Sequence, residues 1–461
     1  MASAMRSRES SLSFDWSSPQ VEEGFAWAKK QALGFVNLGD PVGDWYEAAL
    51  PGREAFCMRD LSHQCTGARV LGLQELTLNM FRHFACNISV TRDWCTFWEI
   101  DKNGHPCPAD YRDDSSFWYN LPANFDVLQA CFREFLWTGN IAYLEEPCFR
   151  RFYAATVGEY IARWDKDGDG IPEHHASYDS RGLGSYNEGG HGKGASLGGD
   201  LIALQYAAFR AFAAMHEHEG SPVIAAELRR RAAGLKLSYN AAWWDSARQR
   251  LQSLMLEGGS FSDEDIPECQ IFPLLCDIID QGEKRERTLQ ATIEGPRPNV
   301  EARTYFPEIW YRYGRNEAAF EELMALVDRA LPRREYPEVS FSVIGSMACG
   351  MMGIDVDARE RMVATIPRLT TEVSWGCMDN VPVLDSLISV RHDGIHESVL
   401  ENRAGPALRW KACFPVNAQH LTVDGKRMPA ETESGRDGKL CSFVTVPMEH
   451  AAKRTISVGR F

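Results

Sequence analysis

The sequence predicts a mainly α fold, a closed ring of helical hairpins followed by a small antiparallel β-module. Apolar residues in about the first 350 positions recur at helical spacing, in about twelve segments that come in pairs. Beyond residue 355 the spacing changes to a period of two. Helices followed by strands indicate separate layers rather than a βαβ fold. Because no repeat of roughly 30–45 residues is present, a ring is favoured over a repeat solenoid.

The helices of the first half have apolar faces and recognisable ends. Leu128, Cys131, Phe132 and Phe135 share one face of a helix that stops before Gly139. Pro147 is tolerated in the first turn of the next helix. The helices predicted in this half cover residues 21–36, 63–73, 74–86, 123–137, 146–164, 197–216 and 223–243.

The second half contains shorter helices and then strands. Pro273 and Pro307 interrupt two of the helical patterns. The predicted helices cover residues 268–281, 283–293, 302–313, 317–330 and 340–352, and the predicted strands cover 388–391, 408–413, 418–423, 442–446 and 454–458. Turn signals at 392–394 and 424–426 separate some of the strands. We therefore expect a catalytic helical domain at 1–378 and a β-sandwich-like module at 379–461.

Composition limits the class of partner and the compartment. The chain has 64 acidic and 49 basic side chains and a net charge of −15, which disfavours nucleic acid and anionic membranes as partners. Its 13 cysteines include no Cys-x-x-Cys pair, a pattern typical of free thiols in a reducing interior. The sequence contains neither a signal-peptide pattern nor an apolar run long enough to span a membrane. A cytoplasmic protein is expected.

Two loops combine aromatic residues with carboxylates. Arg59 and Asp60 end the first loop, and Trp118, Tyr119 and Asn124 belong to the second. A sugar ring presents C–H faces to aromatic rings and hydroxyl groups to carboxylates and amides, so these residues are candidates for carbohydrate binding. The structural alternatives are an ion pair and helix capping.

Residues 165–173 contain Asp165, Asp167 and Asp169 at the spacing of an EF-hand calcium loop. The glutamate expected at position twelve is replaced by Ala176. A tight acidic turn is therefore favoured over a calcium site, and no cofactor is expected to be required.

Further candidates follow this turn. Glu173, Tyr178 and Asp179 lie in a glycine-rich segment that is too long and polar for a simple connection. Glu338 follows Pro337 at the entrance to the last helix, where it is either a charge favoured by the helix dipole or a catalytic carboxylate. Asp265 belongs to an acidic turn that we expect to be solvated.

The segment Trp137-Thr138-Gly139-Asn140, a helix, and then residues 165–173 resembles a region shared by processing α-glucosidases, trehalases and nonlysosomal glucosylceramidases. These families belong to the six-hairpin glycoside hydrolases. The resemblance implies an (α/α)6 toroid that acts on a small glucoside-like substrate. Residues 381–461 resemble the β-rich appendage of some of these enzymes.

The resemblance also implies roles for individual residues. In the α-glucosidase and trehalase branch, Asp179 corresponds to the general acid and Glu338 to the base, and the reaction inverts configuration. From their clustering in loops, and not from the resemblance, we expect Arg59, Asp60, Trp118, Tyr119, Asn124, Glu173 and Tyr178 to bind substrate, and no metal to be needed. In the glucosylceramidase branch, Glu173 would instead be the nucleophile of a retaining β-glucosidase-like enzyme, with Asp265 as acid/base. The distance between the two catalytic carboxyl groups distinguishes these mechanisms. It is about 6.5–9.5 Å in inverting enzymes and about 5–5.5 Å in retaining enzymes.

Two other functions remain open. A phosphorylase on the same scaffold would need cations beside the acid, and Arg181 and Lys193 are candidates. A carbohydrate-binding protein without activity would need no catalytic carboxylates. Candidate carboxylates in three separate loops favour an enzyme.

Overall fold

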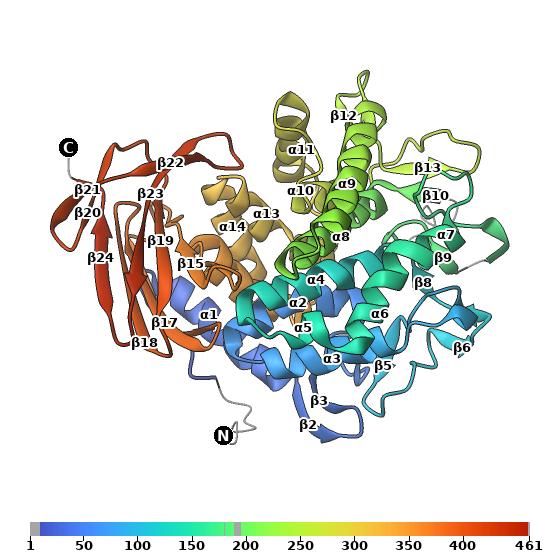
Figure 1. Ribbon diagram of the computed structural model, residues 1–461, viewed down its shortest axis with the longest axis horizontal. Coiled ribbons are helices and arrows are strands. Elements are labelled where there is room, and N and C mark those ends of the chain that lie inside the picture. Colours follow the sequence, from blue (N-terminus) through green and yellow to red (C-terminus); the bar gives the residue numbers. More distant parts are fainter. Residues whose placement is uncertain (1–9, 179, 189–194, 460–461) are drawn as a thin grey trace.

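The computed structural model describes residues 10–178, 180–188 and 195–459. Its helices fill the first three quarters of the chain, and long strands follow (Figure 1). The longer helices are α1 (Pro19–Gly34), α2 (Met58–Leu71), α3 (Gln74–Cys86), α4 (Pro122–Thr138), α6 (Pro147–Ala155), α8 (Gly199–His218), α9 (Pro222–Ala242), α10 (Glu268–Leu275), α11 (Glu283–Glu294), α13 (Phe306–Arg312), α14 (Asn316–Val327) and α15 (Pro337–Gly345). The short helices are α5 (Ala142–Glu145), α7 (Ile161–Trp164) and α12 (Val300–Arg303), and π-helical turns occur at Thr156–Tyr160 and Ser346–Met351.

Most of these helices agree with the sequence prediction, and α3 does so at both ends. Two differences affect the site. Helix α2 begins at Met58 instead of residue 63, so Arg59 and Asp60 lie in its first turn and not in the preceding loop. The helix predicted at 302–313 is divided into α12 and α13, and Pro307 stands in the first turn of α13.

Six helices pack side by side in succession. Helix α2 contacts α4, α4 contacts α8, α8 contacts α10, α10 contacts α13, and α15 contacts α2. Helices α1, α3, α9, α11 and α14 each pack against at least one of these six, and α6 packs against α3. At the α2–α15 contact, a Cβ added to Gly67 would lie 2.0 Å from the carbonyl oxygen of Phe341, so these two backbones touch directly.

The C-terminal strands form two sheets. One has the order β1-β16-β17-β18-β24-β20-β21 and the other β14-β15-β19-β23-β22. The strands are β1 (Ser13–Trp16), β14 (Asp355–Asp357), β15 (Met362–Thr365), β16 (Trp375–Val383), β17 (Ser386–Asp393), β18 (Glu397–Ala404), β19 (Leu408–Phe414), β20 (His420–Val423), β21 (Lys426–Pro429), β22 (Glu431–Ser434), β23 (Leu440–Met448) and β24 (Lys453–Ser457). Neighbours are antiparallel except β15 and β19, which are parallel.

The sheets use more of the chain than the sequence predicts. The expected boundary at 378/379 falls inside β16, and β14 and β15 precede it. Strand β1, near the start of the chain, pairs with β16, with Ser13 opposite Asp379. The sequence did not reveal these strands because three or four residues are too few to establish a period of two.

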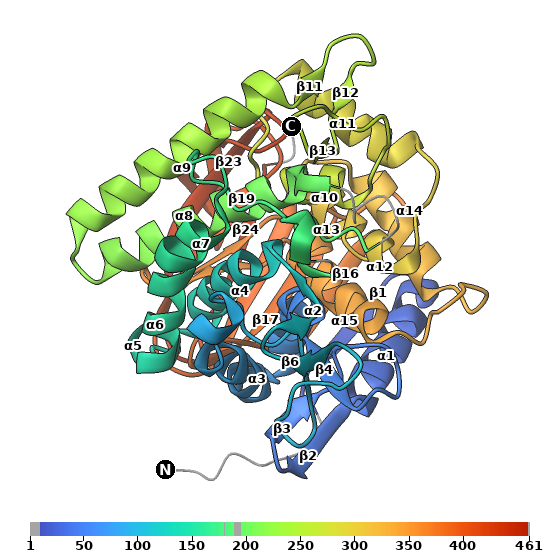
Figure 2. The ribbon, with the colours of Figure 1, turned by 90° about the vertical axis from the view of Figure 1, so that its right-hand side faces the viewer.

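The two ends of the helical layer have different surroundings. Several short strands in the loops, among them β5, β6, β8, β9, β10 and β13, lie on the side away from the two sheets (Figure 1), and Figure 2 views the molecule from that side. The short strands are β2 (Val36–Asp40), β3 (Gly43–Tyr46), β4 (Ala55–Cys57), β5 (Glu99–Asp101), β6 (Tyr111–Asp113), β7 (Ser116–Phe117), β8 (Tyr119–Asn120), β9 (Arg181–Leu183), β10 (Ala195–Gly198), β11 (Trp244–Asp245), β12 (Arg250–Leu251) and β13 (Leu254–Leu256). The last residues of α4 and the residue that ends the π-helical turn after α15, Met352, face the sheets. Trp137 Nε1 donates to the Pro382 carbonyl at 2.7 Å, and His392 Nε2 lies 3.0 Å from the Met352 carbonyl.

In the described part of the chain, no helix is long and apolar enough to cross a membrane.

Candidate active site

Five carboxylates from separate elements are each within electrostatic range of at least one other member of the group. Four come from the beginnings of helices: Asp60 in α2, Glu268 in α10, Glu301 in α12 and Glu338 in α15. The fifth, Glu188, comes from the loop before α8, and its charge acts on Asp60. We call these five residues the carboxylate cluster.

Within the carboxylate cluster, Glu338 is the most buried residue whose pKa is raised. It is 5% exposed, and Pro337 holds the backbone at the first position of α15. Burial raises the pKa of its carboxyl group well above the usual range, the negative charges of Asp60 and Glu301 raise it further, and Arg59 opposes the shift. Among the described residues, Glu338 Oε2 is buried without a hydrogen-bond partner. A substrate hydroxyl or a water molecule could satisfy this oxygen.

Asp60 stands on the adjacent helix, α2. Burial raises the pKa of Asp60 to about 7, Arg59 lowers it, and the charges of Glu188 and Glu301 raise it. A carboxyl group with this pKa exchanges its proton near neutral pH, as acid–base catalysis requires.

Arg59 provides positive charge next to the cluster. Its Nη2 lies 4.0 Å from Glu268 Oε1, and its Nη1 donates to the Tyr186 carbonyl at the long distance of 3.5 Å. The guanidinium also lies 5.4 Å from the centre of the Tyr186 ring. These contacts are loose for a guanidinium group, so Arg59 keeps donor capacity for a ligand.

The loop that carries Glu188 is fixed by buried acidic side chains. Tyr186 donates through its backbone N–H to Asp200 Oδ2 at 2.6 Å and through its hydroxyl to Asp126 Oδ2 at 3.0 Å. Much of Glu188 is accessible. Its carboxyl group is nevertheless deep enough among protein atoms that lost hydration raises its pKa, and neighbouring carboxylates, of which Asp110 is the strongest, add to the shift.

A pair of carboxyl groups, those of Glu99 and Asp110, lies beside the carboxylate cluster. Glu99, in β5, is 2% exposed, and burial together with the carboxyl group of Asp110 raises its pKa to about 9. Arg53 is close to both, with Nε 3.4 Å from Glu99 Oε2 and Nη2 3.8 Å from Asp110 Oδ2. At neutral pH Glu99 therefore carries a proton.

The structure brings together only some of the predicted site residues. Arg59, Asp60 and Glu338 are neighbours. Tyr119 and Asn124 are fully buried and bonded to each other, with the Tyr119 hydroxyl donating to Asn124 Oδ1 at 2.5 Å. Both side chains are therefore part of the core, and their role in substrate binding stays a prediction. Trp118 is half-buried, and its indole N–H donates to Asn120 Oδ1 at 2.7 Å.

Glu173 and Tyr178 belong to a different group of side chains, around Trp164. The Glu173 backbone N–H donates to the Trp164 carbonyl at 2.9 Å, and the Tyr178 ring packs edge-on against the Trp164 indole. Burial raises the pKa of Glu173, and the charge of Asp167 adds to the shift. Asp179 lies outside the described residues.

The predicted acidic turn is present at Asp165, Asp167 and Asp169. Asp165 accepts hydrogen bonds from the backbone N–H groups of Gly168 and Gly170 at 2.7 and 2.9 Å, and Asp169 accepts one from Ile171 at 2.8 Å. One oxygen from each aspartate lies within 4.8 Å of the others. Such spacing is compatible with a cation, but several of these oxygens already serve the turn. Asp265 forms an ion pair with Arg250 and is half exposed.

Sequence reasoning did not select Glu99, Glu188, Glu268 or Glu301 as site residues. Glu188 had a local signal, since Tyr186-Asn187-Glu188 stands in the long glycine-rich loop. Glu268 and Glu301 lack such a signal, because an acidic residue in a first helical turn is common.

No family model matches this sequence, and no curated protein is similar to it. Several solved structures share its fold. A GH78 family rhamnosidase from Bacillus sp. GL1 has a TM-score of 0.61 at 14% identity, over 86% of this chain and 40% of its own. A putative kojibiose phosphorylase from the human microbiome has a TM-score of 0.58 at 8% identity, over 95% of this chain and 63% of its own. A glycosidase in complex with glucose has a TM-score of 0.53 at 11% identity, over 72% of this chain and 96% of its own.

The chain thus spans less than two thirds of the rhamnosidase and of the phosphorylase. At these identities the likeness concerns the fold, which this protein shares with glycoside hydrolases and a phosphorylase.

Proposed function

We propose that this protein is a glycoside hydrolase whose helical pairs close into an (α/α)6 toroid, with the carboxylate cluster at one mouth. The observation that carries the proposal is Glu338. Its carboxyl group is buried, its Oε2 has no hydrogen-bond partner among the described residues, and it lies within electrostatic range of Asp60 and Arg59. The fold shared with glycosidases supports the proposal.

In this proposal Glu338 is the general base that activates water. A base must be ionised, and two features of the site favour this form. Arg59 supplies a positive charge close by, and a proton on Asp60, whose pKa is about 7, removes the nearest negative charge. In this proposal the two carboxyl groups share one proton, which Asp60 holds while Glu338 reacts.

The general acid protonates the leaving oxygen. The family resemblance assigns this role to Asp179. Glu188 is a second candidate from the same loop, because its pKa is raised as an acid requires. Either acid, acting with a base across the pocket and an intervening water, would give inversion of configuration, with the carboxyl groups about 6.5–9.5 Å apart.

Hydrolysis is favoured over phosphorolysis by the state of Arg181. This residue forms an ion pair with Asp93 at 3.0 Å and lies over the Tyr178 ring, so it has less capacity for a phosphate ion. Lys193, the other cation considered, lies outside the described residues. We propose a glucoside-like substrate for this site.

The experiment is a screen of aryl glycosides and natural disaccharides, with and without inorganic phosphate, in which NMR follows the anomer of the released sugar. We expect turnover without phosphate and an inverted product. A retained product would refute inversion, and strict phosphate dependence would favour a phosphorylase. Sugar binding without turnover of any substrate would favour a carbohydrate-binding protein.

Variants separate the two candidate acids. Loss of the true acid should lower kcat strongly for natural disaccharides and weakly for aryl glycosides with good leaving groups. We therefore compare Asp179→Asn with Glu188→Gln on both substrates. Glu75→Gln, an exposed residue of α3, is the matched control. If neither variant changes kcat, both acid assignments are wrong.

A further inference from the structure

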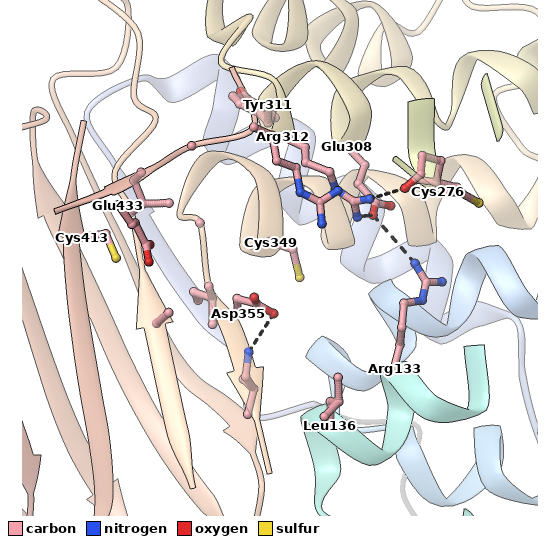
Figure 3. Close-up of a pocket in the computed structure, with 18 of the residues that line it drawn as sticks. Arg133, Leu136, Cys276, Glu308, Tyr311, Arg312, Cys349, Asp355, Cys413 and Glu433 are labelled. Atoms are coloured by element: carbon pink, nitrogen blue, oxygen red, sulfur yellow. Dashed lines mark hydrogen bonds and ion pairs between the residues drawn. The ribbon is translucent and has the colours of Figure 1, made fainter. Parts of the chain in front are cut away.

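A cavity lies at the opposite end of the helices from the carboxylate cluster. Its volume is about 1230 Å³, and it is lined by the C-terminal halves of α2, α4, α8 and α13 and by residues of the sheets (Figure 3). On α2, Arg69 lines this cavity and Asp60 belongs to the cluster. Nine residues of helix separate them, or roughly 13 Å along the axis.

The charge of this cavity differs from that of the whole chain. Its lining includes ten lysine and arginine residues and five aspartate and glutamate residues. Three of the ten cations pair with carboxylates just outside the lining, Arg69 with Glu134, Lys236 with Asp280 and Arg359 with Asp357, which leaves an excess of two positive charges. The chain as a whole has a net charge of −15. A concave region of opposite sign to the rest of the surface attracts ions of the other charge.

Helix capping accounts for part of this positive charge. Arg312 donates to the Leu275 carbonyl at 2.6 Å and forms an ion pair with Glu308. Arg368 donates to the carbonyls of Cys349 and Gly350 at 3.3 and 2.8 Å. Cations at these positions offset the negative ends of the helix dipoles.

Helix capping does not account for the positive charges of Arg210 and Arg436. Arg210 lies on α8 and donates to the Tyr206 hydroxyl at 3.4 Å. Arg436 lies in the turn between β22 and β23. Within the described residues, neither guanidinium has a carboxylate partner. Burial lowers the pKa of Arg436, the positive charges of Arg312 and Arg210 lower it further, and the negative charge of Asp277 opposes the shift, so Arg436 lies within electrostatic range of all three groups.

We propose that this cavity binds a small molecule that carries phosphate groups, held by Arg210 and Arg436. Planar guanidinium groups bind phosphate oxygens through paired hydrogen bonds. The negative charge of the remaining chain disfavours a long polyanion such as nucleic acid. A ligand here would contact the helices and the β22–β23 turn together, so binding should also stabilise the protein against unfolding.

Isothermal titration calorimetry on the full chain tests this site with three probes: pyrophosphate, a hexose phosphate and adenosine triphosphate. Glucose is the uncharged control. We expect at least one phosphate probe to bind, to weaken as salt is raised, and to bind at least tenfold more weakly to Arg436→Gln and to Arg210→Gln. Tighter binding of the hexose phosphate would identify a sugar phosphate as the ligand, and tighter binding of adenosine triphosphate would identify a nucleotide.

Two controls make the result specific. Arg230→Gln removes an exposed arginine of α9 that pairs with Glu227 outside the cavity, and it should leave binding unchanged. Glu338→Gln should also leave binding unchanged, which separates this site from the proposed glycosidase site. The proposal is overturned if no phosphate probe binds, if Arg436→Gln and Arg210→Gln bind as the wild type does, or if either control variant loses binding to the same extent.

Discussion

Replacing Asp60 by asparagine should make the protein more stable and less active. The pKa of Asp60 is raised from 3.8 to about 7 in the folded protein. A raised folded pKa means that the folded state holds the proton more tightly than the unfolded state. The stabilisation this gives is fully present below about pH 4 and is lost as the pH rises through about 7. Asparagine resembles the protonated form and does not undergo this loss.

The stability gained by Asp60→Asn follows from the pKa shift of Asp60. About three pKa units correspond to about 4 kcal/mol at 1.36 kcal/mol per unit. Asp60 is half-buried, so screening by solvent reduces the expected gain to about 2–4 kcal/mol at pH 7 and above. The gain should be smaller at pH 5 and close to zero at pH 4. This is the pattern of a residue retained for function at the expense of stability.

The assay is urea unfolding of wild type and Asp60→Asn between pH 4 and pH 8.5, with activity measured on the best substrate of the screen. Glu75→Gln, on the exposed surface of α3, is the control and should show little pH-dependent difference. Two results would refute the reasoning. One is a variant that is less stable than wild type at pH 7, and the other is a stability difference that does not change with pH.

Three other predictions concern the site, the packing and the acidic turn. Glu338→Gln should lower kcat by about 10²–10⁴ with little change in fold, measured by steady-state kinetics and circular dichroism; full activity would exclude Glu338 as the base. Gly67→Ala should destabilise the protein by about 3 kcal/mol in urea unfolding, because its Cβ would overlap the Phe341 carbonyl oxygen, whereas Gly234→Ala, with open space around it, should not destabilise. Calcium or a chelator should leave Tm unchanged, because Asp165 and Asp169 already bind backbone N–H groups; a rise of several degrees with calcium would show a metal site.

The sequence by itself determined the helices, because helical periodicity is a property of residues close together in the chain. The limits of α3 could be read directly, and α4 was located to within one residue at each end. The same reasoning failed for β1, β14 and β15. Their pairing partners lie elsewhere in the chain, and segments of three or four residues carry no readable period.

Arg59, Asp60 and Glu338 could also be selected from the sequence, because each stands where a polar loop meets an apolar helix. Tyr119 and Asn124 share that pattern, but the fold buries them in the core. Only the tertiary structure decided this difference, since burial depends on what packs against a residue. The same holds for the pKa values of Asp60, Glu99 and Glu338, which are raised first by burial. Helix packing brings α2 and α15 together from distant parts of the chain, and it thereby places two carboxyl groups where neither ionises independently of the other.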